Sequence, residues 1–84
     1  VVYAAINKDF VVVQGQVDLA VLLPDEIWLL DFKTDHLQPV ELPEKVAAYR
    51  PQLQIYAAAL AAIYGKPVTR RWLHFLALRE TVSV

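Results

Sequence analysis

Short apolar runs separated by polar residues fill the N-terminal part of the chain, and this pattern predicts β-strands. Turn signals stand at Asn7-Lys8-Asp9 and at Pro24-Asp25. Gly15 interrupts the second and longest run, which predicts a bulge or a close approach of the backbone. Because the connection at Pro24-Asp25 is so short, the strands on either side of it should pair as an antiparallel hairpin. The predicted strands cover residues 1–6, 10–23 and 27–34.

The C-terminal part of the chain changes to a helical composition. Residues 45–64 are rich in Ala, Leu and Gln and contain no Gly, which predicts a helix. Residues 39–44 provide an acidic start, and Gly65 provides a stop. Pro51 either kinks this helix or marks its true first turn.

A last apolar run over residues 72–78 predicts one more strand and completes the order β-β-β-α-β, which belongs to the α+β or α/β class. Residues 1–84 are enough for a single small domain. With 57% hydrophobic residues and a mean hydropathy of +0.37, the chain can bury enough apolar surface to fold, which excludes intrinsic disorder.

The absence of cysteine limits the chemistry of any site. It excludes a disulfide framework, a thiolate zinc site and an iron–sulfur cluster, and it fits a cytoplasmic protein. No apolar run reaches the roughly 18 residues of a membrane helix, so we expect no membrane contact. The chain begins within an apolar run and contains no Met, which we interpret as a piece of a longer protein.

Asp18, Asp31 and Lys33 form the first candidate constellation. Asp31 and Lys33 are two residues apart in a predicted strand, so they project from the same face. If the hairpin turns at Pro24-Asp25, Asp18 lies directly opposite Asp31. Two carboxylates facing each other among apolar residues repel and lose hydration, and a hard divalent cation held by both would offset that cost. The alternative is a strand-end ion pair with a solvated Asp18, since a slip by one residue sends one carboxylate to the other face.

Gln52 and Tyr56 form the second constellation, on the predicted helix. They are at positions i and i+4 and share one face, which Tyr49 and Lys45 continue. The alternative is an amphipathic helix whose tyrosines are ordinary core aromatics. Gln52 fits that alternative less well, because a buried amide requires hydrogen-bond partners.

Taken together, these residues resemble the PD-(D/E)XK nuclease core. The blocks are G-x-x-D at Gly15 to Asp18, D-x-K-T-D at Asp31 to Asp35, and Q-x-x-x-Y at Gln52 to Tyr56. More narrowly they resemble the C-terminal nuclease domain of AddA/RecB-type, UvrD-like helicase–nucleases, over roughly residues 10–78. Each block is weak alone, and the specificity lies in their combination and order. The resemblance implies a restriction-endonuclease-like fold.

The resemblance also implies roles for the individual residues. Asp18 and Asp31 would bind Mg²⁺, with Mn²⁺ as the alternative, and the Phe32 carbonyl would be a further ligand. Lys33 would orient the attacking water or stabilise the charge that develops on the phosphate. Gln52 and Tyr56 would support the centre and the phosphate from the helix. Absent cysteines separate this chain from the iron–sulfur members of the family.

The function implied is that of a metal-dependent DNA exonuclease domain in a helicase–nuclease that processes double-strand ends in recombinational repair. The alternative is an inactive DNA-binding or scaffold domain of the same fold. Eight basic and nine acidic side chains nearly balance, so contact with DNA must be local or assisted by neighbouring domains. The expected partners are DNA, the helicase domains of the parent chain and a second helicase–nuclease subunit.

Family members carry a helix before the first strand, and this chain starts too late to contain it. We therefore expect the isolated 84 residues to be weakly active or inactive. A partly uncovered sheet face would also invite self-association. Of the remaining polar residues, we interpret His36 as exposed, His74 as structural, and Asp35 as a cap for its loop or a partner of backbone groups.

Overall fold

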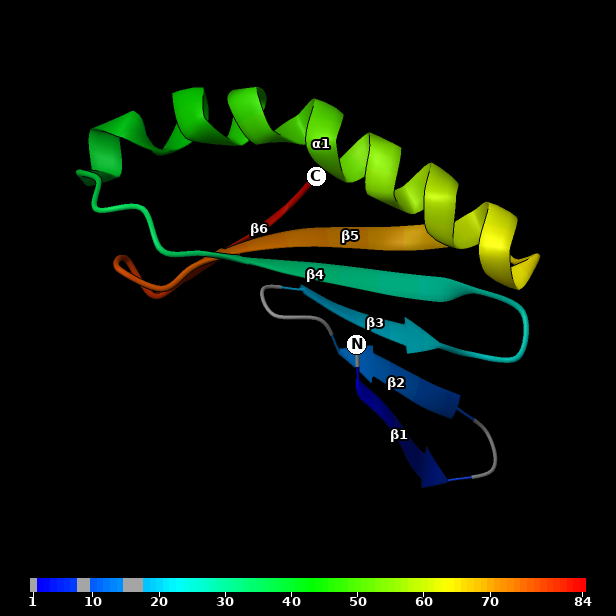
Figure 1. Ribbon diagram of the computed structural model, residues 1–84. Coiled ribbons are helices and arrows are strands. Elements are labelled where there is room, and N and C mark those ends of the chain that lie inside the picture. Colours follow the sequence, from blue (N-terminus) through cyan, green and yellow to red (C-terminus); the bar gives the residue numbers. More distant parts are fainter. Residues whose placement is uncertain (1, 8–9, 15–17) are drawn as a thin grey trace.

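The computed structural model describes residues 2–7, 10–14 and 18–84, with side chains from Asp18 onward, and consists of one sheet and one long helix (Figure 1). Six strands lie in the sheet in chain order. Their bounds are β1 Val2–Asn7, β2 Phe10–Gln14, β3 Asp18–Leu22, β4 Ile27–Lys33, β5 Val68–Phe75 and β6 Glu80–Ser83. The connection from β4 to β5 contains the short 3-10 helix η1 (Pro39–Glu41) and the helix α1 (Leu42–Tyr64).

All neighbouring strands are antiparallel except β4 and β5, which are parallel. Parallel neighbours need a long crossover, and α1 supplies it. The α+β class expected from the sequence is confirmed. The hairpin between β3 and β4 turns where predicted, with the Leu23 N–H donating to the Glu26 carbonyl at 2.8 Å.

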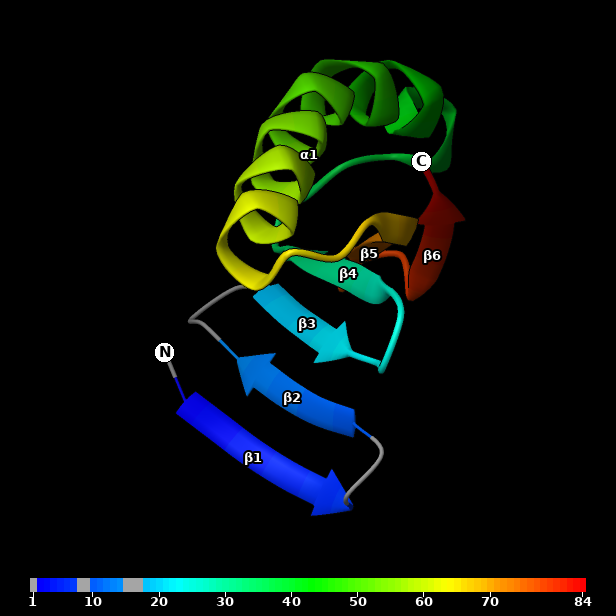
Figure 2. The ribbon, with the colours of Figure 1, turned by 90° about the vertical axis from the view of Figure 1, so that its right-hand side faces the viewer.

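Helix α1 packs on one face of the sheet, as Figures 1 and 2 both show. Alternate side chains of β4 point toward it, so Ile27, Leu29 and Asp31 are buried while their neighbours are partly exposed. The helix contributes buried residues at helical spacing. The larger core cluster consists of Leu29, Leu37, Val46, Leu53, Leu73 and Phe75.

The predicted end of α1 is confirmed, and the helix begins at Leu42, inside the segment 39–44 that was expected to provide its acidic start. Gly65 adopts a left-handed φ of 68° and its N–H donates to the Ala61 carbonyl at 2.8 Å. The helix begins at Leu42 because Pro43 lies in the first turn, where no backbone N–H is needed. Pro51 lies inside the helix. No helix in residues 18–84 is long and apolar enough to cross a membrane.

The prediction of one strand over residues 10–23 is wrong, because the structure divides this run into β2 and β3. The two are antiparallel neighbours, with Val11 opposite Leu22. The one glycine that interrupts this run does not distinguish a bulge from a reversal of the chain, so the sequence did not separate the two strands. The bulge predicted at Gly15 lies outside the described residues.

The prediction of a final strand over residues 72–78 is also wrong in its bounds. β5 begins four residues earlier, at Val68, and β6 follows it as an unpredicted antiparallel neighbour. The chain reverses around Arg79, which has a positive φ of 53°. Neither Gly, Pro, Asn nor Asp occurs from Leu76 to Arg79, so no turn signal marked the reversal. The element order is therefore β-β-β-β-α-β-β.

Candidate active site

Asp18 and Asp31 lie directly opposite each other in the ladder between β3 and β4, as predicted. Directly opposite residues in an antiparallel pair project from the same face of the sheet. On β3 that face also carries Ala20 and Leu22, both buried on the α1 side. The two carboxylates therefore lie on the helix-covered face.

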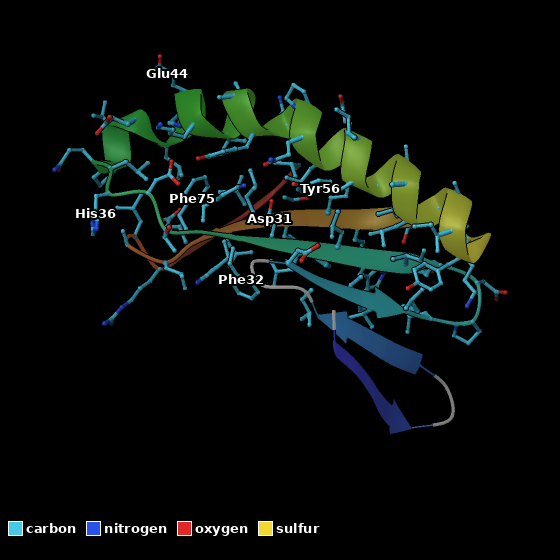
Figure 3. All side chains as sticks on the ribbon, viewed as in Figure 1. Asp31, Phe32, His36, Glu44, Tyr56 and Phe75 are labelled. Carbon is cyan, nitrogen blue, oxygen red and sulfur yellow. The ribbon has the colours of Figure 1, made fainter. Side chains whose placement is uncertain are left out.

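Asp31 is fully buried and poorly satisfied. Its relative exposure is 0%, and neither carboxylate oxygen takes part in a hydrogen bond. The Lys33 Nζ atom is 3.1 Å from Asp31 Oδ2, an ion pair without hydrogen-bond alignment. Figure 3 shows Asp31 on the α1 side of β4. A buried carboxylate with free lone pairs is costly unless something else binds it, so this residue meets a requirement for a cation ligand.

Lys33 joins the sheet to the helix. Its Nζ donates a hydrogen bond to Gln52 Oε1 at 2.8 Å, which brings the second constellation to the first. The same nitrogen lies 4.2 Å from the centre of the Tyr49 ring, in a cation–π contact. The lysine side chain is only 13% exposed, so these contacts operate largely away from bulk water.

Tyr56 and Phe32 are less engaged than Gln52. Tyr56 lies one turn after Gln52, is 37% exposed, and makes no hydrogen bond to another described side chain. The Phe32 side chain points to the opposite face, where its ring packs edge-on against His74 at 5.9 Å. Its main-chain carbonyl, the predicted ligand, belongs to the strand segment between Asp31 and Lys33.

Asp35 has a role that the sequence did not reveal. The predicted contact with backbone groups is present, and in addition its Oδ2 accepts a hydrogen bond from Tyr49 Oη at 2.7 Å. Lys45 Nζ lies 3.6 Å from the same oxygen. The spacing of Lys45 and Tyr49 on one helix face was visible in the sequence, but nothing there identified Asp35 as their shared partner.

The contact between Asp35 and Tyr49 shifts both groups. The hydrogen bond from Tyr49, aided by the charge of Lys45, holds the pKa of the Asp35 carboxyl below its ordinary value. The same hydrogen bond, together with burial and the charges of Asp35 and Asp31, raises the pKa of Tyr49 to about 12. The pair is therefore a carboxylate and a neutral phenol across the neutral range.

The donor set fits a hard divalent cation. Carboxylate and carbonyl oxygens are the preferred ligands of Mg²⁺, which usually takes only one or two protein carboxylates. Within residues 18–84 no group of three or more His, Cys, Asp or Glu side chains converges, so Asp18 and Asp31 stand as a pair. This set matches a cation that keeps several of its waters and is at odds with a closed structural metal site.

Comparison with known proteins agrees with this chemistry. Residues 2–82 match the sequence model of the PD-(D/E)XK nuclease superfamily. An ATP-dependent helicase/nuclease subunit of Carboxydothermus hydrogenoformans is 36% identical over 74 residues, 88% of this chain and 6% of that protein. The protein of the same name from Streptococcus pyogenes serotype M5 is 42% identical over 69 residues, 81% of this chain and 6% of that protein. The chain thus spans about 6% of the length of these relatives.

Proposed function

This chain belongs to the PD-(D/E)XK nuclease superfamily, whose restriction-endonuclease-like α+β core its mixed sheet and helix form, and we propose that it is a metal-dependent DNA exonuclease core. The observation that carries the proposal is the buried, unsatisfied carboxylate of Asp31, opposite Asp18 and beside Lys33. In a fold stabilised only by packing, a buried carboxylate without hydrogen-bond partners costs stability and brings no gain. In a metal-dependent nuclease centre, the same carboxylate is needed as a ligand of the cation.

Asp18, Asp31 and the Phe32 carbonyl would hold the cation, which we propose to be Mg²⁺, with Mn²⁺ as a substitute. When bound, such a cation supplies a water of lowered pKa and neutralises charge on the phosphate. The packing around the fully buried Asp31 restricts the movement of its side chain, which favours a preorganised ligand.

Besides the metal ion, the Lys33 ammonium would supply a positive charge close to the phosphate. An ammonium group has three donors, and the structure accounts for one of them with Gln52, while Asp31 is an ion-pair partner without an aligned hydrogen bond. A further donor would be available to a phosphate oxygen or to the attacking water. Tyr56, partly exposed one helical turn from Gln52, would support the centre and the phosphate from the helix.

We propose that the domain works within a longer helicase–nuclease that processes DNA double-strand ends in recombinational repair in the cytoplasm. The names of the two relatives support the helicase–nuclease part of this proposal, and the chain covers about 6% of the length of each. Its partners would be DNA, the helicase domains of the same protein and a second helicase–nuclease subunit. With a formal net charge of −1, the domain relies on neighbours for most electrostatic attraction to DNA.

The test is cleavage of linear DNA with Mg²⁺ by the full-length helicase–nuclease, comparing Asp31→Ala and Lys33→Ala with the unsubstituted protein. We expect each substitution to lower the cleavage rate by about 100-fold or more while ATP-driven unwinding continues. Glu44→Gln, an exposed change on α1 pointing away from the sheet (Figure 3), is the matched control and should cut normally. Unchanged cleavage in both site variants would reject the assignment and favour an inactive DNA-binding or scaffold role.

A further inference from the structure

We propose that Asp35 and Tyr49 are positioning residues that hold the Lys33 ammonium in place between Asp31 and Gln52. The inference rests on the proposed nuclease function and extends it to residues outside the metal and phosphate contacts. Three successive contacts support it. The Asp35 carboxylate contacts the Tyr49 hydroxyl, the Tyr49 ring contacts the Lys33 ammonium, and the ammonium contacts the site.

The first contact fixes the tyrosine ring. Asp35 lies two residues beyond Lys33, directly after β4, whereas Tyr49 lies on α1. The 2.7 Å hydrogen bond between them therefore ties the strand end to the helix. The Tyr49 ring also packs against the ring of Phe75, with centroids 6.3 Å apart. Apolar packing alone would let the ring slide in its plane, and the hydroxyl contact opposes that movement.

The second contact fixes the lysine. A lysine side chain is a flexible four-carbon stem whose conformational freedom must be restricted before the ammonium can act at one point. The Tyr49 ring lies 4.2 Å from Nζ and forms one wall for it. Asp31 at 3.1 Å and Gln52 at 2.8 Å form two others. Without the ring, the two polar contacts would leave the ammonium open on one side.

An ordinary core role for Tyr49 makes a different prediction. If the ring only fills space, Tyr49→Phe keeps its function, because phenylalanine retains the ring and its contact with Phe75. If the hydroxyl positions the ring for Lys33, Tyr49→Phe and Asp35→Ala should have the same effect, and the double variant should be no worse than either single one.

The kinetic experiment uses the full-length helicase–nuclease and linear DNA with Mg²⁺. We expect Tyr49→Phe and Asp35→Ala each to lower kcat by about tenfold with little change in KM, as loss of a hydrogen bond to a charged group allows. In the Lys33→Ala background, Tyr49→Phe should cause no further loss. Glu44→Gln, an exposed substitution on the helix that carries Tyr49, again serves as the control. Full activity of Tyr49→Phe, or a tenfold loss that persists without Lys33, would overturn the proposal.

A spectroscopic experiment on the 84-residue protein tests the positioning without any catalysis. The chain has four lysines, so the ε-methylene signals can be assigned by NMR with Lys33→Ala as reference. We expect the two ε-protons of Lys33 to be shifted upfield by the Tyr49 ring and to differ from each other, as in an ordered side chain. In Tyr49→Phe and Asp35→Ala the two signals should converge. Identical Lys33 signals in all three proteins would overturn the positioning role.

The two experiments separate the two proposals. If no protein cleaves DNA while the Lys33 signals respond as expected, the nuclease assignment fails and the positioning geometry stands. If cleavage depends on Asp31 and Lys33 but neither kcat nor the signals respond to Asp35 and Tyr49, the nuclease assignment stands and this inference fails.

Discussion

At the scale of single residues, Asp31 is where stability and function conflict. Its carboxylate is fully buried with unsatisfied oxygens, and Lys33 is the one ion-pair partner that it has among the described residues. Breaking such a pair usually destabilises a protein, whereas replacing the whole arrangement with apolar residues often does not. The arrangement therefore makes sense as part of a site that a cation completes.

The first residue-scale prediction concerns that cation. Mg²⁺ at about ten times its Kd should stabilise the fold by about 1.4 kcal/mol, because it binds only the folded state. In a domain of this size each kcal/mol of added stability raises the Tm by roughly 4–8 °C, so the effect of Mg²⁺ is measurable by circular dichroism. Asp31→Asn should abolish the rise, while Glu44→Gln should keep it. An equal rise in Asp31→Asn would mean that the cation binds elsewhere.

The second prediction concerns Tyr49 at alkaline pH. Because its pKa is raised to about 12, the folded state holds the phenolic proton more tightly than the unfolded chain does. The resulting stability is complete below the ordinary pKa of 10.0 and is lost as the pH rises through the raised value. Titration of tyrosinate absorbance should show a late-ionising group that Tyr49→Phe removes. A titration curve that Tyr49→Phe leaves unchanged at high pH would contradict the hydrogen bond to Asp35.

The third prediction concerns the other partner of this bond at acid pH. The lowered pKa of Asp35 means that its contribution to stability is present above the ordinary value of 3.8 and disappears as the pH falls through the lowered one. Asp35→Asn should therefore be less stable than the unsubstituted protein at neutral pH. In urea unfolding, the difference should shrink as the pH falls below 3.8. A difference that is constant with pH would exclude the charge of Asp35 as its cause.

At the scale of elements, α1 has two tasks that use different sides of one helix. Val46, Leu53 and Ala57 bury its core side, while Tyr49 and Gln52 face the site. Figure 1 shows α1 arched, with its concave side toward the sheet. Pro51 lies within the arch and cannot donate a hydrogen bond to the Ala47 carbonyl.

The element-scale prediction follows from that missing bond. Pro51→Ala should raise the free energy of unfolding by about 1–3 kcal/mol, since alanine restores the donor and removes the ring clash. Ala58→Pro, at an exposed position later in α1, should lower it by about 3 kcal/mol. Both are measured by urea denaturation. A loss of stability in Pro51→Ala would show that the arch itself is needed for packing.

At the scale of the whole molecule, the two faces of the sheet differ. Helix α1 lies over one face of the sheet at β4 and β5, with β1 and β2 beyond it (Figure 2), whereas in the described part of the chain the other face presents half-buried apolar side chains. Trp28 and Trp72 meet there edge-to-face, with centroids 6.1 Å apart. An apolar face of this kind favours association with a partner or with a second copy.

The whole-molecule prediction is that the isolated 84 residues self-associate through this face. Val21→Lys places a charge opposite Trp28 on the uncovered side and should shift sedimentation toward the monomer. Ile55→Lys, which adds the same charge at a 68% exposed position on α1, is the matched control and should leave association unchanged. If Ile55→Lys dissociates the protein and Val21→Lys does not, the contact lies on the helix.

The sequence by itself determined those features that depend on local signals. The Pro24-Asp25 turn sets the register of β3 and β4, and that register alone puts Asp18 opposite Asp31. Gly65 ends α1 because a residue without Cβ adopts a positive φ without strain. The position of Gln52 and Tyr56 on one face of the helix followed from their i, i+4 spacing.

Only the tertiary structure decided features that depend on residues distant in the chain. A single glycine in the run from Phe10 to Leu23 does not distinguish a bulge from a reversal between two strands, and no turn residue marks the reversal at Arg79. Asp35 and Tyr49 meet across 14 positions, because α1 crosses over the sheet and returns Tyr49 to the end of β4. Local chemistry placed the carboxylates, and the packing of α1 on the sheet placed the residues that hold the lysine.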